Sequence, residues 1–226
     1  MIAIVPMKHN SERVKDKNFK SLCGKPLFSY VLDSLLASAK IKKVVVNTDS
    51  DVISEGVAKL FGNKIEISVR PKEICGDFVS MNRVIEFEIK RNGAGEYLQT
   101  HTTNPFLKTA TIDGAIEKFR SSLGEGYDSL FSVNVIKSRL YDESFRPINH
   151  DPANLIRTQD LPPVYDENSN LYIFSDKSFA KKQARIGTKP FLFPMDKVEA
   201  IDIDNQDDWD LAESRMQNLR KPGQGQ

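Results

Sequence analysis

The sequence predicts a three-layer α/β fold built on a mostly parallel sheet. Short apolar runs that read as buried strands alternate with longer segments in which apolar residues recur every three or four positions, as they do in helices. Parallel neighbouring strands need such helical crossovers, so the alternation indicates a parallel sheet covered by helices. The length of 226 residues fits one large domain, and the sequence contains no internal repeat.

The first half of the chain supplies four strand-and-helix pairs. Strands are expected at residues 2–6, 42–50, 65–70 and 96–101. Helices are expected at residues 25–39, 51–62, 77–93 and 111–124. Pro26 suits a first helical turn, Gly62 can close the second helix, and Asp77 can cap the third.

The second half begins in the same way and then changes character. After a strand at 129–136, residues 137–165 are polar and rich in proline, which predicts an excursion from the domain. Strands are expected again at 170–174, 191–195 and 200–204, followed by a helix at 206–219. Trp209, Ala212, Met216 and Leu219 share one face of that helix, and Trp209 is expected in the core. We therefore expect one domain at residues 1–220 and a flexible tail at 221–226.

The charge balance excludes some classes of partner. Lys and Arg number 32 against 31 Asp and Glu, so there is no basic excess for nucleic acid or an anionic membrane. No apolar run approaches the ~20 residues that cross a bilayer. Met1 leads directly into the first strand, and Cys23 and Cys75 lie far apart, so we expect no signal peptide and a cytoplasmic protein with reduced thiols.

A strongly charged loop follows the first strand. The segment PMKHNSERVKDKNF and its neighbours carry five cations, Lys8, Arg13, Lys15, Lys17 and Lys20. Ligands of open parallel sheets bind beyond the carboxyl ends of the strands, where cations and backbone N–H groups can face phosphate oxygens. The same residues would also make an ordinary solvated loop, and the sequence lacks the glycine and lysine pattern of a P-loop.

Two carboxylates lie near the other end of the chain. Asp202 and Asp204 alternate along the predicted strand at 200–204, which would place them on one face. A few hard oxygen ligands, completed by phosphate and water, suit Mg²⁺. Asp204 could instead cap the following helix, although Asn205 could serve equally well.

The opening of the chain resembles the acylneuraminate cytidylyltransferase family, the CMP-sialic-acid synthetases and their relatives. Ser11, Lys17 and Asn18 match the polar loop of that family, and the segment 22–27 (LCGKPL) matches its L-x-G-K-P-L motif. Further matching segments follow in order as far as Glu213. They are VVVNTDSDVI, RPKEICGD, LQTHTTNPF, RTQDLPPVYDENSNLYIF and AIDIDNQDDWDLAE.

The resemblance implies a Rossmann-like nucleotidyltransferase fold and a specific reaction. A hydroxyl of a nonulosonic (sialic-acid-like) 2-keto sugar acid attacks the α-phosphate of CTP, and a CMP-sugar and pyrophosphate form with the help of Mg²⁺. The product would feed glycan biosynthesis. The excursion at 137–165 would help to form the sugar pocket and a homodimer contact. The sugar itself is left open, since pockets separate small substituents by only about 1–3 kcal/mol.

The resemblance also implies roles for individual residues. The catalytic residues would be Lys17, Asp202 and Asp204, with the two aspartates as metal ligands. The nucleotide would be bound by Lys8, Ser11, Asn18, Arg70 and Gln99. The sugar acid would be bound by Arg157, Gln159, Tyr165 and Asn168. Two residues keep alternatives: Arg70 could brace its loop or pair with Asp77, and His101 is expected only to pack or hydrogen-bond locally.

This chain departs from the family pattern at several positions. Lys8 stands where the family usually has Arg, and Ser169 replaces a Gly after Asn168. Three other functions are compatible with parts of the pattern. A CMP-Kdo-type cytidylyltransferase would share the sheet, a glycosyltransferase could use the Asp202–Asp204 motif for a metal, and an inactive relative could bind nucleotide without turnover.

Overall fold

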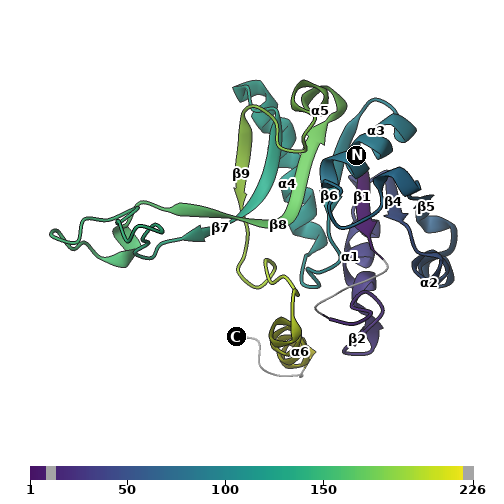
Figure 1. The fold of residues 1–226 in the computed structure, drawn as a ribbon, viewed down its shortest axis with the longest axis horizontal. Coiled ribbons are helices and arrows are strands. Elements are labelled where there is room, and N and C mark those ends of the chain that lie inside the picture. Colours follow the sequence, from purple (N-terminus) through teal and green to yellow (C-terminus); the bar gives the residue numbers. More distant parts are fainter. Residues whose placement is uncertain (9–13, 221–226) are drawn as a thin grey trace.

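The computed structural model of the chain describes residues 1–8 and 14–220. Ser11 and the expected tail at 221–226 lie outside the described residues. The core is a seven-stranded sheet in the order β5-β4-β1-β6-β8-β7-β9 (Figure 1). Every neighbouring pair is parallel except those that involve β8, which confirms the prediction of a mostly parallel sheet.

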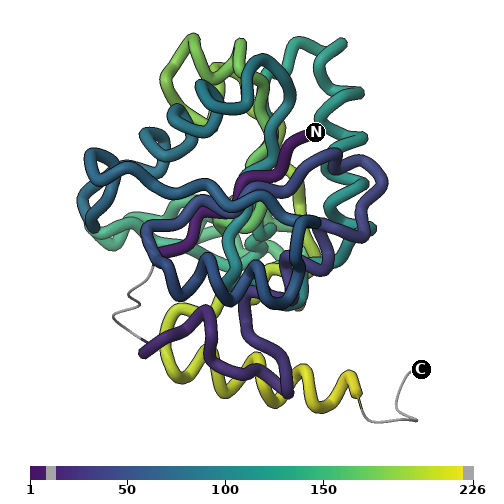
Figure 2. The backbone as a smooth tube through the Cα atoms, turned by 90° about the vertical axis from the view of Figure 1, so that its right-hand side faces the viewer, coloured from purple at the N-terminus to yellow at the C-terminus, as the bar shows by residue number. Residues whose placement is uncertain are grey.

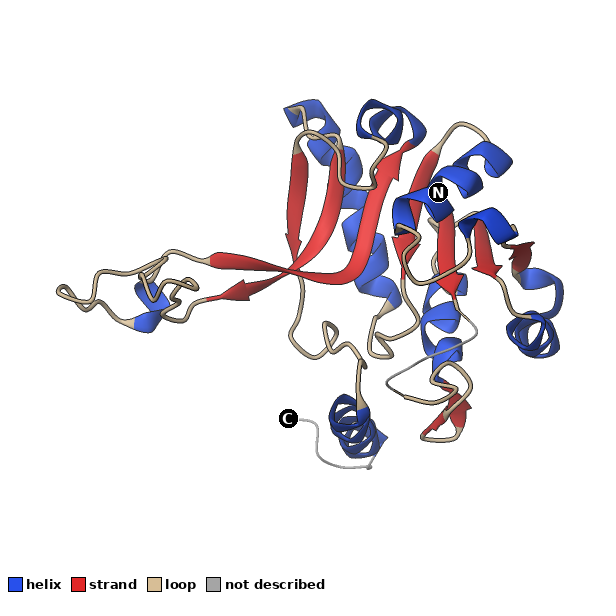
Figure 3. Ribbon diagram, in the orientation of Figure 1, coloured by secondary structure: helices blue, strands red, loops and turns tan. Residues whose placement is uncertain are grey.

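The two longest strands of this sheet, β7 and β8, extend beyond its body (Figure 3). The strands of the sheet are β1 Ile2–Met7, β4 Lys43–Thr48, β5 Glu66–Val69, β6 Glu96–Thr100, β7 Ser129–Ile136, β8 Val164–Ser175 and β9 Pro190–Pro194. A small hairpin is formed by β2 Ser21–Leu22 and β3 Lys25–Pro26. Its two turn residues, Cys23 and Gly24, both have positive φ (49° and 88°), which explains the glycine of the LCGKPL segment.

Helices cover both faces of the sheet and complete the three layers. The α-helices within the described residues are α1 Leu27–Leu36, α2 Asp51–Phe61, α3 Met81–Asn92, α4 Thr109–Ser122, α5 Asp176–Lys182 and α6 Gln206–Arg220. Apolar residues of α1, α2 and α4 form the large core on one face, and those of α3 and α5 pack on the other. None of these helices is long and apolar enough to span a membrane.

Local signals set most helix boundaries. Ser50 caps α2 by accepting a hydrogen bond from the Ile53 N–H at 3.2 Å, and Gly62 ends that helix as expected. The expected cap of α3 is wrong, because Ser80 caps the helix and Asp77 instead forms an ion pair with Lys8 at 3.0 Å. The expectation for Pro26 is also wrong, since it precedes the first turn of α1 and pairs in the small hairpin.

A separate apolar cluster joins α6 to residues 14–27, called here the first-loop segment because they follow the charged loop after β1 (Figure 2). Trp209 is 2% exposed and lies in this cluster, which confirms its expected place in the core. Leu219 was expected on the same face but is 61% exposed, so the buried stripe of α6 ends at Met216. The buried members of the cluster are Val14, Leu22, Leu27, Phe106, Ile203, Trp209, Ala212 and Met216.

The prediction of a strand at 200–204 is wrong. Residues 201–204 have no regular secondary structure and belong to no strand of the sheet. The Ile203 N–H instead donates to the Thr103 carbonyl at 2.9 Å, and the Ile203 side chain is buried in the cluster with α6. The apolar and acidic alternation that suggested a strand therefore belongs to an extended segment held by a neighbouring loop.

Strands β7 and β8 continue beyond the sheet as an arm (Figure 3). The excursion expected at 137–165 makes up the outer part of this arm. The register between the two strands shifts between Phe131 and Val133 where the arm leaves the body. Ser169 has φ = 55° in the same region, a conformation that favours glycine and accounts for the glycine of the family pattern.

We expect replacement of Trp209 by Ala to destabilise the protein by about 3–5 kcal/mol, because the change leaves a cavity between α6 and the first-loop segment. The matched control is Leu219→Ala on the same helix, which should change the unfolding free energy by less than about 0.5 kcal/mol. Urea denaturation measures both values. Equal losses in the two variants would contradict the assignment of Trp209 to a core that fixes α6.

Candidate functional site

Lys17 and Asp204 meet at the carboxyl end of β1. The Lys17 Nζ donates to the Ile203 carbonyl oxygen at 2.7 Å and lies 3.7 Å from Asp204 Oδ1. The Lys17 side chain is only 12% exposed, whereas that of Asp204 is 44% exposed. The structure thus brings together two predicted catalytic residues from opposite ends of the chain.

The carboxylate of Asp204 does not cap α6. The Asn205 side chain caps the helix by accepting from the Asp208 N–H at 3.0 Å. Asp208 Oδ2 in turn accepts from the backbone N–H groups of Asp204 and Asn205, each at 3.0 Å. Of the two roles considered for Asp204, the structure therefore gives the helix cap to its neighbour.

Asp202 is a partly buried carboxyl group whose charge is poorly compensated. Its Oδ1 atom is buried without a hydrogen-bond partner among the described residues, while Thr103 donates to the carboxyl group. Burial raises the pKa of Asp202, and the negative charge of Asp204 adds to this effect, whereas Thr103 and Lys17 oppose it. A cation beside Asp202 and Asp204 would relieve both effects.

The two aspartates fit a divalent cation that takes its remaining ligands from elsewhere. In the described part of the chain, no group of three or more His, Cys, Asp or Glu side chains is placed to hold a metal by itself. Two carboxylates with phosphate and water oxygens are a ligand set that suits Mg²⁺. Asp202 and Asp204 would hold the ion.

The loop after β6 contacts both segments that form this site, the one that carries Lys17 and the one that carries Asp202 and Asp204. Thr102 Oγ1 donates to Asn18 Oδ1 at 2.6 Å, which ties the loop to the first-loop segment. Asn104 Nδ2 donates to the Ile201 carbonyl at 3.3 Å, next to Asp202. The family resemblance implied that small polar residues of the LQTHTTNPF segment contact the nucleotide, but its alignment did not assign that role to Thr102 or Asn104 individually.

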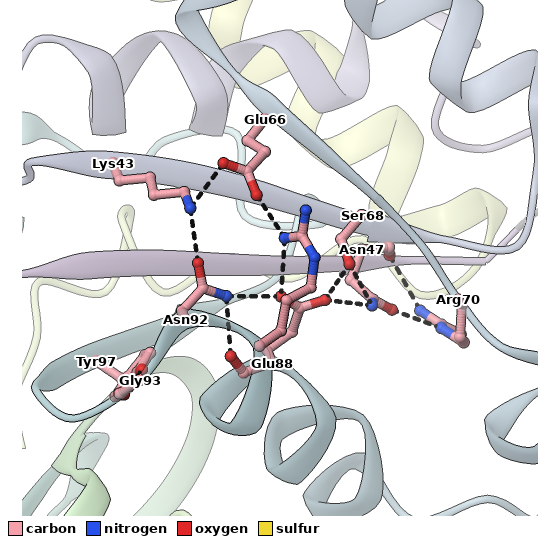
Figure 4. A network of polar contacts seen from close by, with 10 residues as sticks. Lys43, Asn47, Glu66, Ser68, Arg70, Glu88, Asn92, Gly93 and Tyr97 are labelled. Atoms are coloured by element: carbon pink, nitrogen blue, oxygen red, sulfur yellow. Dashed lines mark hydrogen bonds and ion pairs between the residues drawn. The ribbon is translucent and has the colours of Figure 1, made fainter.

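Arg70 is a buried brace at the end of β5 (Figure 4). Its Nε donates to Asn47 Oδ1 at 2.7 Å, and its Nη2 donates to the carbonyls of Met7 at 3.3 Å and Asn47 at 3.1 Å. Asn47 also donates to the fully buried Glu88 at 2.6 Å. Of the roles considered for Arg70, these contacts favour bracing of the β1 end over an ion pair with Asp77.

Lys8 and Asn18, two further candidates for binding the nucleotide, both form contacts with other protein groups. Asn18 is 9% exposed, and besides Thr102 it contacts the Lys8 carbonyl, to which its Nδ2 donates at 3.4 Å. Lys8 is 44% exposed and reaches Asp77 across the mouth of the loop. Lys8 therefore lies at the carboxyl end of β1, and Asn18 joins this end to the loop after β6.

Gln99 is fully buried on β6, and its amide is saturated by protein groups. Its Nε2 donates to the Thr100 carbonyl and lies 3.1 Å from His101 Nε2, while its Oε1 accepts from Arg185 Nη1 at 2.5 Å. Because the Gln99 amide nitrogen can only donate, His101 Nε2 accepts and the His101 proton lies on Nδ1. Sequence reasoning missed Arg185, which lies in a loop far from Gln99 in sequence.

The His101 ring contacts the Gln99 amide and is influenced by the charges of Lys17 and Asp204. Burial is the largest cause that lowers the pKa of His101 to about 4; the positive charges of Arg185 and Lys17 act in the same direction, and the negative charge of Asp204 opposes them. The imidazole is therefore neutral at pH 7. Gln99 therefore lies between His101 and Arg185 in a chain of direct contacts.

The candidate sugar-binding residues lie along β8 and the arm. Asn168 is 8% exposed and accepts from Ser132 Oγ at 2.5 Å, whereas Tyr165 is 46% exposed. Arg157 pairs with Asp160 at 2.6 Å, and the Gln159 carbonyl accepts from Lys137. The arm stands away from the body in Figure 1, so Arg157 and Gln159 are not brought to Lys17 within the same chain.

A cavity of about 640 Å³ lies at the base of the arm. Residues 134–138 form one wall, and Ala200 and Ile201, which lead to Asp202, form another. Asp166 and Lys197 also line it. The cavity therefore lies between the arm and the segment that carries the two aspartates.

The sequence model of the family described as "Cytidylyltransferase" matches residues 2–217. The chain belongs to the cytidylyltransferase family. Among curated relatives, it is 28% identical over 222 residues to N-acylneuraminate cytidylyltransferase A of Danio rerio, covering 95% of this chain and 50% of the relative. It therefore spans about half the length of that relative.

A second cytidylyltransferase relative is similar along its whole length. The CMP-N,N'-diacetyllegionaminic acid synthase of Legionella pneumophila is 29% identical over 233 residues, which cover 96% of each chain. The N-acylneuraminate cytidylyltransferase of Escherichia coli is 28% identical over 94% of this chain and 51% of the relative.

Solved structures confirm the Rossmann-like nucleotidyltransferase fold. A CMP:2-keto-3-deoxy-manno-octonic acid synthetase complexed with CTP superposes with a TM-score of 0.69 at 13% identity, covering 96% of this chain and 98% of the other. A 4-diphosphocytidyl-2C-methyl-D-erythritol synthase from Anaerococcus prevotii gives 0.68 at 12% identity, with the same coverage.

We expect the low pKa of His101 to appear in the pH dependence of stability. Between pH 6.5 and about 4 the unfolded chain binds a proton at this residue and the folded protein does not, so stability is lost as the pH falls through this window. His101→Gln should remove up to about 1.4 kcal/mol per pH unit of that loss.

Urea denaturation of both proteins at several pH values from 7.5 to 4.5 measures this difference. The two unfolding free energies should run parallel above pH 7 and diverge below pH 6. Parallel lines over the whole range would show that His101 is not held neutral by burial.

Proposed function

We propose that this protein transfers a cytidylyl group from CTP to a nonulosonic 2-keto sugar acid and releases pyrophosphate. The observation that carries the proposal is the meeting of Lys17 with Asp204, beside the undercompensated Asp202, in a chain of the cytidylyltransferase family. The names of the relatives, which act on N-acylneuraminate and on N,N'-diacetyllegionaminic acid, support this class of sugar acid.

The reaction exchanges one phosphorus–oxygen bond for another. The anomeric hydroxyl oxygen bonds to the α-phosphorus, the bond to the bridging oxygen of the β-phosphate breaks, and pyrophosphate leaves with that electron pair. Lys17, held by the Ile203 carbonyl, would place its ammonium group against phosphate oxygens. One of the two aspartates would accept the hydroxyl proton.

Mg²⁺ held by Asp202 and Asp204 would supply charge neutralisation on the triphosphate. The neutral imidazole of His101 keeps a further positive charge away from the ammonium group of Lys17. We also place the reaction in the cytoplasm, a reducing compartment that suits the free Cys23 and Cys75.

Pyrophosphate release tests this proposal directly. The purified protein is incubated with CTP, Mg²⁺ and one acid at a time from a panel of neuraminic, legionaminic and pseudaminic types, with the eight-carbon acid Kdo as a comparison. We expect release with at least one nonulosonic acid and little with Kdo. Release with Kdo alone, or none with any acid, would refute the proposal.

Asp204→Asn should lower kcat by about 10²–10³-fold, the loss typical of removing one group that stabilises transition-state charge. The unfolding free energy should change by less than about 1 kcal/mol, since Asn205 and not Asp204 caps α6. The matched control is Asp207→Asn, an exposed carboxylate three positions along, which should retain full activity. Equal kcat values for the two variants would remove Asp204 from the site.

We further propose that the arm docks on a second copy of the chain and forms a homodimer. The arm exposes large apolar side chains, with Phe145 87%, Leu155 69% and Ile148 56% exposed. An isolated two-stranded ribbon is marginally stable in water, so a partner surface would stabilise it. Docking would also bring Arg157 and Gln159 of one chain close to the substrate site of the other chain.

Phe145→Glu should weaken this dimer. Sedimentation equilibrium should give twice the 25.5 kDa chain mass for the wild type and a mass closer to one chain for the variant. Phe78→Glu is the matched control, because Phe78 is fully exposed but lies outside the arm, so that variant should stay dimeric. A monomeric wild type, or a dimer unaffected by Phe145→Glu, would contradict the proposal.

A further inference from the structure

Arg185 is a mostly buried cation whose hydrogen-bonding capacity is largely unused. Its side chain is 18% exposed, and the guanidinium lies over the Tyr172 ring at 3.5 Å from the centroid. Within the described residues its side chain makes one hydrogen bond, from Nη1 to Gln99 Oε1. The nearest carboxylate, Glu167, is 3.9 Å from Nη2, which is too far for a hydrogen bond.

The guanidinium is held firmly in this position. The backbone N–H of Arg185 donates to Asn82 Oδ1 at 3.1 Å, which ties the loop to α3. Two residues later, the Gly187 N–H donates to Ser129 Oγ at 2.8 Å on β7. A stacked and braced guanidinium with spare donors is already arranged for an oxygen acceptor.

Arg185 lies against β8, the strand that carries the sugar-acid candidates Tyr165 and Asn168. The sheet reverses its order between β1 and β6, and ligands of such sheets bind in the crevice at that point. Lys8 and Arg70 belong to the β1 side and Asn18 joins that side to the loop after β6, whereas Arg185 contacts Gln99 on β6 and Tyr172 on β8.

The contacts of Arg185 lead as far as His101. Gln99 joins Arg185 to His101, which lies within electrostatic reach of Lys17 and Asp204. A substrate placed between Lys17 and β8 would therefore meet Arg185 with a part remote from the α-phosphate.

We propose that Arg185 is a specificity-determining residue that donates hydrogen bonds to an oxygen of the sugar acid. The acceptor is the carboxylate or an acyl-amide oxygen, both of which suit a guanidinium fork. Gln99 is the positioning residue, since its amide is consumed in orienting Arg185 and His101. This inference rests on the proposed function, because it assigns a contact to the second substrate of that reaction.

The test separates the two substrates kinetically. Arg185→Met keeps an apolar side chain that can lie on Tyr172 but removes every donor, and Arg185→Lys keeps one charged group. We expect the KM for N-acetylneuraminic acid to rise about tenfold or more in Arg185→Met and less in Arg185→Lys, while the KM for CTP changes less than twofold. The control Lys177→Met, on the exposed face of α5, should leave both KM values unchanged.

A second acid identifies the acceptor. An analogue with a hydroxyl in place of the 5-acylamido group keeps the carboxylate. An equal rise in KM for both acids assigns Arg185 to the carboxylate, and a rise for the acylamido acid alone assigns it to the acyl oxygen. A rise in the KM for CTP, or a fall in kcat with both KM values unchanged, would overturn the proposal.

Equilibrium binding keeps the inference testable apart from turnover. Calorimetric titration of N-acetylneuraminic acid into the protein with CTP, in the absence of added metal, should show binding by the wild type and a loss of about tenfold or more in Arg185→Met. Equal binding by the two proteins, or no binding by a folded wild type, would overturn the proposal. An inactive wild type that binds the acid through Arg185 would refute the proposed function alone.

Discussion

The packing of α6 against the segment after the first loop is the interaction on which the site depends. Trp209 and Ile203 share an apolar cluster with Leu22 and Leu27, and this cluster carries the Asp202–Asp204 segment to Lys17. The ammonium group of Lys17 then bonds the Ile203 carbonyl, so the apolar and polar contacts reinforce one another. Burial of apolar area supplies the free energy that holds two groups of opposite charge, far apart in sequence, in fixed positions.

A network of buried hydrogen bonds fixes the neighbouring part of the sheet edge, at the carboxyl ends of β1, β4 and β5. Glu88 is fully buried and accepts from Asn47, which in turn accepts from Arg70 (Figure 4). Arg70 closes the network on the Met7 carbonyl at the end of β1. Such a network is costly if any member is missing, because the remaining polar groups lose both water and partner. The mouth of the first loop is thus held by hydrogen bonds on one side and by apolar packing on the other.

The sheet and most helices could be predicted from the sequence, because strand and helix periodicities are local signals. The meeting of Lys17 with Asp204 was predicted by the resemblance to the cytidylyltransferase family and not by periodicity. The strand at 200–204 could not be excluded, since an alternating pattern is common to any extended segment with one buried face. Ile203 turns that face toward α6, which only tertiary contacts decide. Arg185 gave no signal at all, because its partner Gln99 lies 86 residues away and ordinary loops also contain arginine.

The 186 residues that separate Lys17 from the Ile203 carbonyl set an order of events during synthesis. At about 5–20 residues per second, the cationic loop leaves the ribosome roughly 10–40 s before the carboxylates do. During that interval the nascent chain carries first Leu22 and Leu27 and later Phe106 without the helix that covers them. The growing polypeptide therefore lacks the assembled contact between Lys17 and the Ile203 carbonyl, and exposes apolar side chains that favour aggregation, until α6 has been translated.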